Sequence, residues 1–229
     1  KKNILTLRGS FRPVTKVNID MLTNGLEKFK KNKKVDENNI QILIEITLSN
    51  LKSEGEVNER DFLDRADILC SLGYTVMISN YKKYYKLTEY LSQYTSARMG
   101  LIIGVDNLVS MFDEKYYRNL NGGIMEAFGI IVTRDIKIYL YPYQPNSDKI
   151  IQNSTNIPIH PRAKSIYQYL YSNKRIEDID YNSEFLNIFS KDVLKKINSC
   201  ETGTWEHMVP DGVAEIIKEK SLFGMSCKI

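Results

Sequence analysis

The residues best suited to take part in chemistry follow the first apolar run of the chain, at residues 4–7. They are Gly9, Ser10, Phe11, Thr15, Lys16 and Asn18. A glycine at a strand-to-helix turn lets the backbone approach a phosphate closely, and the free N–H groups at a helix start attract anions. The side chains at 15, 16 and 18 can add hydrogen bonds or charge. This spacing predicts an anion site, and the alternative is a purely structural turn punctuated by Pro13.

The elements that must position these residues alternate between strands and helices. Short apolar runs with strand composition lie at residues 4–7, 40–46, 74–78, 100–103 and 136–141. Segments with helical spacing lie between them, at residues 18–29, 59–72, 84–95 and about 108–128. Parallel strands need long crossovers, so this alternation predicts an α/β fold: a doubly wound parallel sheet forming a Rossmann-like core over residues 1–143.

A change of composition follows this core. Residues 144–161 are rich in Pro, Asn and Ser and predict a surface loop. Helical patterns then occupy residues 162–172, 191–199 and 210–220. We therefore expect residues 144–229 to form a helical C-terminal part packed on the same domain. Because a strand-like run begins almost at once after Lys1, we also expect the chain to be a fragment of a longer polypeptide.

Composition excludes several classes of protein. With 42% hydrophobic and 26% charged residues, the 229-residue chain is neither disordered nor fibrous, and a net charge of +4 gives no strong nucleic-acid signal. No apolar run approaches the ~20 residues of a membrane span, and no signal peptide is recognisable. Cys70, Cys200 and Cys227 show no metal-site spacing, so we expect reduced thiols, a cytoplasmic location and no membrane partner.

Three stretches carry a resemblance to a known family. Residues 9–18, GSFRPVTKVN, are similar to the Gly-[Ser/Thr]-Phe-x-Pro-x-[His/Thr]-x-x-His signature of the nucleotidyltransferase superfamily. Residues 102–108, IIGVDNL, resemble the Ile-x-Gly-Ala-Asp-Asn-Leu segment of nicotinate and nicotinamide mononucleotide adenylyltransferases. In the tail, residues 188–194 partly match Ile-Ser-Ser-Thr-x-Ile-Arg, and residues 208–223 match the ending of that family. The chain resembles a variant of this domain that bacterial proteins carry as a C-terminal portion.

The resemblance implies an enzyme that transfers AMP from ATP to nicotinate or nicotinamide mononucleotide (NaMN or NMN) and releases pyrophosphate, usually with Mg²⁺. It also implies small nucleotides as partners, and we expect a possible homo-oligomer. The residues that it marks as catalytic are Thr15, Asn18 and Lys16. Those that it marks for nucleotide binding are Gly9, Ser10, Phe11, Gly104, Asp106, Asn107, Ser190 and Lys191.

Two positions depart from the family pattern. Asn18 replaces a histidine, and an amide can donate a hydrogen bond but cannot become cationic. Leu194 stands where the family has an arginine that clamps the ATP phosphates. A lysine or arginine elsewhere would have to supply that charge, and the candidates are Lys191, Lys195, Lys16 and Arg12. The alternative function is a catalytically inactive nucleotide-sensing or protein-interaction module. A third reading is a plain α/β scaffold with no anion site.

For other candidate residues, a functional and a structural role are both open. Glu45 and Asp106 end predicted strands, where carboxylates could position Mg²⁺ or a ribose hydroxyl or could merely cap helices. His160 and His207 have no partner in a recognisable motif and are expected to be surface or packing residues. A basic cluster is expected to be a solvated helix end, with a phosphate or nucleic-acid patch as the alternative: Lys28, Lys30, Lys31, Lys33 and Lys34.

Overall fold

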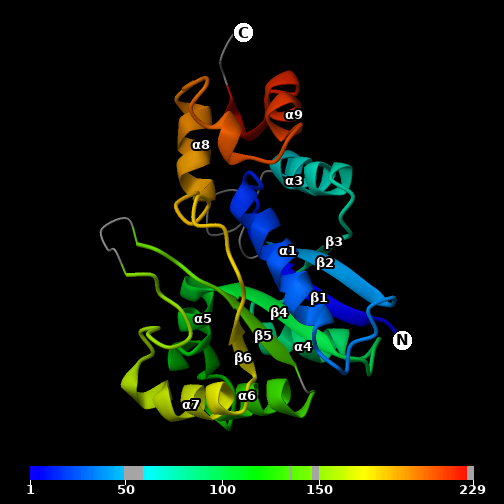
Figure 1. The fold of residues 1–229 in the computed structure, drawn as a ribbon, viewed down its shortest axis with the longest axis vertical. Coiled ribbons are helices and arrows are strands. Elements are labelled where there is room, and N and C mark those ends of the chain that lie inside the picture. The colour runs from blue at the N-terminus through cyan, green and yellow to red at the C-terminus, as the bar shows by residue number, and fades with distance from the viewer. Residues whose placement is uncertain (49–58, 135, 146–149, 226–229) are drawn as a thin grey trace.

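Six parallel strands form one sheet in the computed structural model, which describes residues 1–48, 59–134, 136–145 and 150–225 (Figure 1). Their order across the sheet is β3-β2-β1-β4-β5-β6. The strands are β1 (Asn3–Arg8), β2 (Ile40–Thr47), β3 (Val76–Ser79), β4 (Met99–Gly104), β5 (Lys137–Tyr141) and β6 (Ile176–Asp178). The winding reverses between β1 and β4, which confirms the predicted doubly wound, Rossmann-like sheet.

Helices cover both faces of this sheet. The longer ones are α1 (Lys16–Lys30), α3 (Glu59–Ser71), α4 (Tyr84–Leu91), α5 (Val105–Met111), α6 (Gly123–Thr133), α7 (Lys164–Ser172), α8 (Ser190–Asn198) and α9 (Val213–Glu219). Single 3₁₀ turns lie at Glu114–Tyr117, Pro161–Ala163, Glu206–Met208 and Leu222–Gly224. None of the described helices is both long enough and apolar enough to cross a bilayer.

Alternating side chains along the strands build two separate cores. Tyr139 and Tyr141 of β5 face the core that contains α1, α3, α8 and α9. Ile138 and Leu140 face the opposite core, which contains α4, α5, α6 and α7. Buried parallel strands are apolar on both faces, so they appear in the sequence as the continuous apolar runs from which the sheet was predicted.

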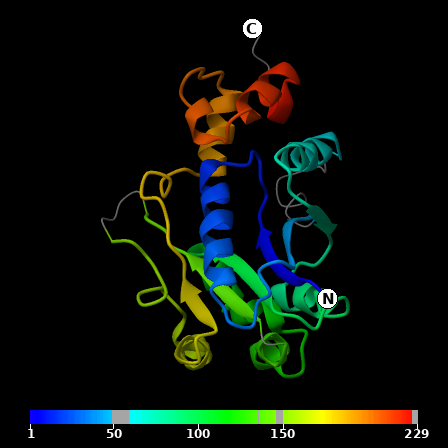
Figure 2. The ribbon, with the colours of Figure 1, turned by 45° about the vertical axis from the view of Figure 1, so that its right-hand side comes forward.

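The C-terminal part differs from the prediction in one element. Its three expected helices are present, but Ile176–Asp178 adds a sixth strand beside β5, so the sheet extends beyond residue 143. A three-residue strand with two acidic residues is too short and too polar to show an apolar run. Helices α8 and α9 lie at the top of the molecule in Figures 1 and 2, beyond the start of α1.

The cysteines also differ from the prediction. Cys70 is free and exposed, as a reduced thiol should be. Cys200 takes part in a disulfide, so the expectation of reduced thiols is wrong at this residue. The reason is that a wide separation along the chain does not fix a separation in the fold. Cys227 lies outside the described residues.

Candidate functional site

A cleft of about 270 Å³ opens at the carboxyl ends of β1 and β4, where the winding of the sheet reverses. Ligands of open α/β sheets bind at this position. The cleft is lined by Leu7, Arg8, Gly9, Ser10, Phe11, Val17, Asn18, Met21, Gly104, Val105, Asp106, Asn107, Tyr141, Pro142, Tyr143, Leu186, Ile188, Phe189 and Ser190. The first two stretches and residues 188–190 of the tail therefore contribute to one cleft, whereas residues 208–223 do not line it.

The glycine turn after β1 folds tightly on itself. Phe11 has a left-handed backbone, with φ of 49°, and its ring is buried against Gly9. A Cβ on Gly9 would lie 2.9 Å from Cζ of that ring, so only glycine fits there without a shift. The backbone N–H of Gly9 donates to the carbonyl of Glu45 at 3.2 Å. Gly9 thus provides space in the cleft, and its own N–H is already used within the protein.

Asn18 is held in a defined orientation at the start of α1. Its Oδ1 accepts hydrogen bonds from the backbone N–H and the hydroxyl of Thr15, each at 3.0 Å. Because a backbone N–H can only donate, the amide oxygen must face Thr15 and the Nδ2 group must point away from it. Thr15 itself is fully buried and does not line the cleft. Thr15 therefore positions Asn18, and Asn18 presents a donor on the cleft side.

The cation in the cleft is Arg8, to which the sequence analysis assigned no role. Both carboxylate oxygens of Glu45 accept hydrogen bonds from its guanidinium, and the Nη2–Oε1 distance is 2.9 Å. Ser79 also donates to Glu45, and the guanidinium lies 4.6 Å from the ring centre of Tyr84. The parallel register pairs Arg8 with Glu45 directly. That pairing of opposite charges at two predicted strand ends is the signal that could have identified the residue.

These contacts change the interpretation of Glu45. A carboxylate with no exposed surface, already bonded to Arg8 and Ser79, presents no accessible oxygen to Mg²⁺ or a ribose. Burial raises the pKa of Tyr84 to about 12, so its phenol stays neutral beside the ion pair. Asp106 is the acidic residue that lines the cleft, and it is exposed at the first turn of α5. The described residues include no cluster of three or more His, Cys, Asp or Glu side chains able to hold a metal ion.

Two predicted cations lie outside the cleft. Lys16 lines a separate hollow of about 320 Å³ with Pro210 and Asp211. At ~100° per residue, positions 16 and 18 of a helix point in nearly opposite directions, so Lys16 and Asn18 cannot face the same cleft. Lys191 is exposed and absent from the cleft lining, whereas Ser190 lines it and donates to the carbonyl of Pro13 at 3.0 Å.

The other suggested cations are placed elsewhere too. Arg12 pairs with Asp61 at 3.0 Å, and Lys195 is exposed on α8 outside the cleft. Leu194 packs against the core that contains α8, so it is a hydrophobic packing residue in this chain. His160 and His207 do not line the cleft either, in line with the expectation of surface or packing roles.

Aromatic residues that follow β5 and precede α8 complete the cleft. Tyr143 and Phe189 pack edge to face, with ring centres 5.8 Å apart. The buried hydroxyl of Tyr141 donates to Oδ2 of Asp20 at 2.6 Å, which ties β5 to α1. Burial, followed by this carboxylate, raises the pKa of Tyr141. Tyr143 and Phe189 can stack on a base or a pyridine ring. Their spacing in the sequence is equally typical of a core, so the sequence alone does not mark these aromatic residues as part of the site.

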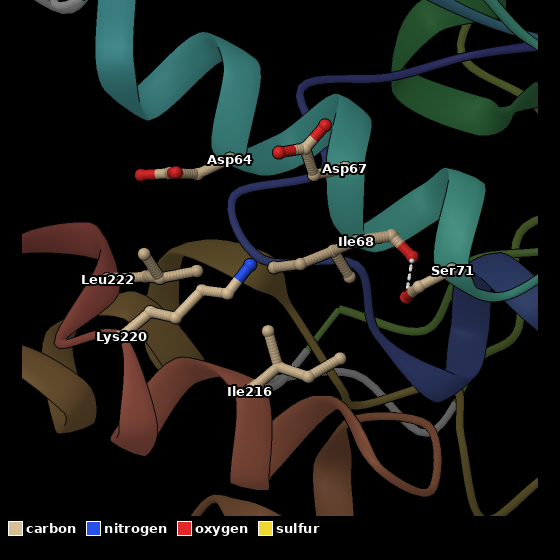
Figure 3. A pocket seen from close by; sticks show the side chains of 7 residues that line it. All are labelled: Asp64, Asp67, Ile68, Ser71, Ile216, Lys220 and Leu222. Atoms are coloured by element: carbon tan, nitrogen blue, oxygen red, sulfur yellow. Dashed lines mark hydrogen bonds between the residues drawn. The ribbon is translucent and has the colours of Figure 1, made fainter.

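Figure 3 shows a smaller cavity between α3 and the end of α9. It measures about 60 Å³ and is lined by Asp64, Asp67, Ile68, Ser71, Ile216, Lys220 and Leu222. Burial raises the pKa of Asp64, although Arg60 and Lys220 act in the other direction. This cavity has less than a quarter of the volume of the cleft, about 60 Å³ against about 270 Å³, so it is too small for a nucleotide.

Comparison with known proteins supports the fold. No family model matches the chain, and no curated protein matches it. Among solved structures, it resembles Plasmodium falciparum nicotinic acid mononucleotide adenylyltransferase complexed with NaAD, with a TM-score of 0.59, 13% identity and 100% of both chains covered. A candidate nicotinate-nucleotide adenylyltransferase from Vibrio parahaemolyticus matches with a TM-score of 0.44 and 11% identity over 99% of this chain and 98% of that one.

The fold thus defines a class of proteins, the α/β domains with a parallel doubly wound sheet. Within that class, the chain resembles the mononucleotide adenylyltransferases over its whole length, as the three sequence stretches predict. At 13% identity this likeness concerns the fold alone.

Proposed function

We propose that this protein binds ATP in the cleft between β1 and β4 and transfers AMP to nicotinate or nicotinamide mononucleotide. The observation that carries the proposal is the meeting of the three ordered motifs in that cleft, at the reversal of the sheet. A phosphate oxygen of the mononucleotide would attack the α-phosphorus of ATP. The bond from that phosphorus to the bridging oxygen would break, and pyrophosphate would leave with the electron pair.

Alignment and charge stabilisation are the tasks of the protein in such a transfer. The Nδ2 group of Asn18, directed away from its cap, would donate to a phosphate oxygen. Arg8, held by Glu45, would supply a fixed positive field on the same side. Compared with a cationic histidine, a neutral amide would lower the stabilisation of the leaving pyrophosphate by ~1–3 kcal/mol. We therefore expect slow turnover.

Mg²⁺ and the aromatic rings of the substrates would contact other parts of the lining. Mg²⁺ commonly takes one or two carboxylates together with substrate phosphates, so Asp106 would hold it here, and the ion would offset phosphate charge. Tyr143 and Phe189 would stack on one of the two rings of the substrates. Gly104, Asn107 and Ser190 line the cleft beside them and would contact the sugar or the phosphates.

A second candidate function is nucleotide sensing without turnover. The specific observation is that Leu194 packs against the core, while Lys16 and Lys191 do not line the cleft. The cleft would then keep a nucleotide site but lack the cations that activate a leaving pyrophosphate. The cytoplasmic location and a homo-oligomeric state stay predictions under either function.

Calorimetry and a product assay separate the two functions. The protein is titrated with ATP, with NaMN and with NMN, and pyrophosphate release is then measured with Mg²⁺ present. Binding with release supports the transferase, and binding without release supports the sensor. If no nucleotide binds at millimolar concentration, both are wrong. Asn18→Ala should weaken ATP binding, and Asn38→Ala, a change of an exposed asparagine outside the cleft lining, is its matched control.

A further inference from the structure

Helix α3 is tied to the turn after β1 through one buried arginine. Arg65, in the middle of α3, is among the largest fully buried side chains, and its Nη1 group donates to the backbone carbonyl of Ser10 at 3.2 Å. Figure 2 shows α3 beside the segment that joins β1 to α1. A guanidinium is costly to bury unless its charge and its hydrogen bonds are satisfied, so the fold determines the position of Arg65 strongly.

Asp61 supplies the charge that Arg65 needs. It lies one helical turn earlier on α3, its side chain is 7% exposed, and its Oδ2 accepts a hydrogen bond from Nη2 of Arg65. Its Oδ1 accepts from Nε of Arg12 at 3.0 Å. One carboxylate thus pairs with an arginine of the helix and with an arginine of the turn. We call Asp61 and Arg65 the α3 clamp, because together they hold the turn at Ser10 and at Arg12.

The turn that the α3 clamp holds is part of the cleft, whereas the clamp is not. Ser10 and Phe11 line the cleft, and none of the α3 residues, all of which the structure describes, is in the lining. Phe11 has a left-handed backbone, with φ of 49°. This conformation costs free energy in a residue with a side chain, and it persists only where the surroundings impose it. Because the clamp holds the residues on either side of Phe11, it helps to impose this conformation.

The direction of the Ser10 carbonyl decides where the next backbone donor points. The peptide bond between Ser10 and Phe11 is trans, so its C=O and N–H groups point in opposite directions within one planar unit. Since Arg65 holds the carbonyl on the side of α3, the N–H of Phe11 points away from α3. Backbone N–H groups fixed in a turn are good donors to phosphate oxygens.

We propose that the α3 clamp positions the N–H of Phe11 to donate to a phosphate oxygen of the nucleotide in the cleft. Asp61 and Arg65 are then positioning residues, because they act through the carbonyl of Ser10 and touch neither ATP nor the reacting atoms. This inference rests on the proposed function. Leu194 stands where the family resemblance expects a cation, and a backbone donor fixed in advance would meet part of that need.

The amide signal of Phe11 in nuclear magnetic resonance tests the proposal on the full chain. The protein is prepared with isotope-labelled phenylalanine, and the Phe11 signal is identified as the one that disappears in Phe11→Leu. ATP and inorganic pyrophosphate are then titrated separately. We expect each ligand to shift the Phe11 amide proton, because a hydrogen bond to an anionic oxygen is short and strong. The amide of Phe128, which lies in the core on the other face of the sheet, is the internal control.

Arg65→Lys tests the clamp itself. Lysine keeps a charge beside Asp61 but lacks the planar fork that reaches this carboxylate and the Ser10 carbonyl together. We expect this variant to bind ATP about tenfold more weakly, with a smaller Phe11 shift, since the donor is no longer fixed. Leu69→Ala is the matched control, a buried residue one turn further along α3 whose apolar side chain cannot hydrogen-bond to the turn. It should lower the melting temperature through the cavity that it leaves, without changing the ATP affinity.

Asp61→Glu is the second variant, and it decides the question if Arg65→Lys does not fold. It keeps the charge but displaces it by one methylene group, so it should weaken ATP binding too. If ATP binds but the Phe11 signal does not shift, or if the folded clamp variants keep the full affinity, the inference is wrong and the proposed function stands. Equal losses of affinity in Leu69→Ala and Arg65→Lys would also overturn it. If neither ATP nor pyrophosphate binds at millimolar concentration, both the inference and the proposed function fail.

Discussion

Both carboxylate oxygens of Glu45 accept hydrogen bonds from the guanidinium of Arg8, the residue opposite it in the register of β1 and β2. Glu45 has no exposed surface, and the side chain of Arg8 is 8% exposed. A pair buried to this extent fixes the geometry of a charge at the edge of the cleft. It also makes each partner costly to remove, because the other then stays buried without compensation.

Replacing Glu45 by Gln should therefore destabilise the fold strongly. The guanidinium of Arg8 would lose its counter-charge while remaining inside the protein, a change that costs ~3–5 kcal/mol in comparable buried pairs. Urea unfolding followed by circular dichroism measures the loss. Glu184→Gln, at an exposed position, should change the free energy of unfolding by ~0.5 kcal/mol or less. Equal effects of the two substitutions would show that the buried pair has no special role in stability.

Asn18→Asp should separate the structural role of this residue from its role toward ligands. A carboxylate oxygen can still accept from the backbone and hydroxyl of Thr15, and an acid in the first turn suits the helix dipole. The stability should therefore change by only ~0.5 kcal/mol. The donor facing the cleft becomes an anion, however, so calorimetry should show ATP binding weakened at least about tenfold. Unchanged ATP affinity would remove Asn18 from the proposed site.

Gly9→Ala should strain the turn after β1. The new Cβ would lie 2.9 Å from the buried ring of Phe11, so the ring has to move, at a cost of ~1–3 kcal/mol. Thermal unfolding measures this loss, and a second change, Phe11→Leu, should make the alanine less costly by giving it space. Gly104→Ala is the matched control, because a Cβ there meets nothing within 4 Å. A similar loss in the control would point to backbone effects instead of the contact with the ring.

The sequence predicts the sheet well because burial on both faces leaves continuous apolar runs, as in residues 100–103 of β4. Prediction from the sequence fails for features that depend on how distant segments pack together. Strand β6 is short and acidic, and its pairing with β5 depends on the preceding crossover. The periodicity of helix α1 turns Lys16 away from the cleft and toward a separate hollow. A motif written as a linear pattern does not contain this information. Arg8 was recognisable only through the register that places Glu45 opposite it.

The pH dependence of stability should include a contribution from Glu206, whose contacts lie in the turn before α9 and on α9 itself. Desolvation raises the pKa of this carboxyl, but the backbone N–H groups of Gly203 and Trp205 and the ammonium of Lys218 outweigh it and lower the pKa to about 2. A carboxyl with a lowered folded pKa stabilises the protein above its unfolded pKa of ~4.3, and this stability is lost as the pH falls toward the folded value.

Glu206→Gln should therefore cost about 1–2 kcal/mol at pH 7, allowing for partial solvent screening, and clearly less at pH 3. Urea unfolding of both proteins at the two pH values measures the difference. Glu219→Gln, at an exposed position, is the control, and a penalty for Glu206→Gln that is as large at pH 3 as at pH 7 would contradict the assignment.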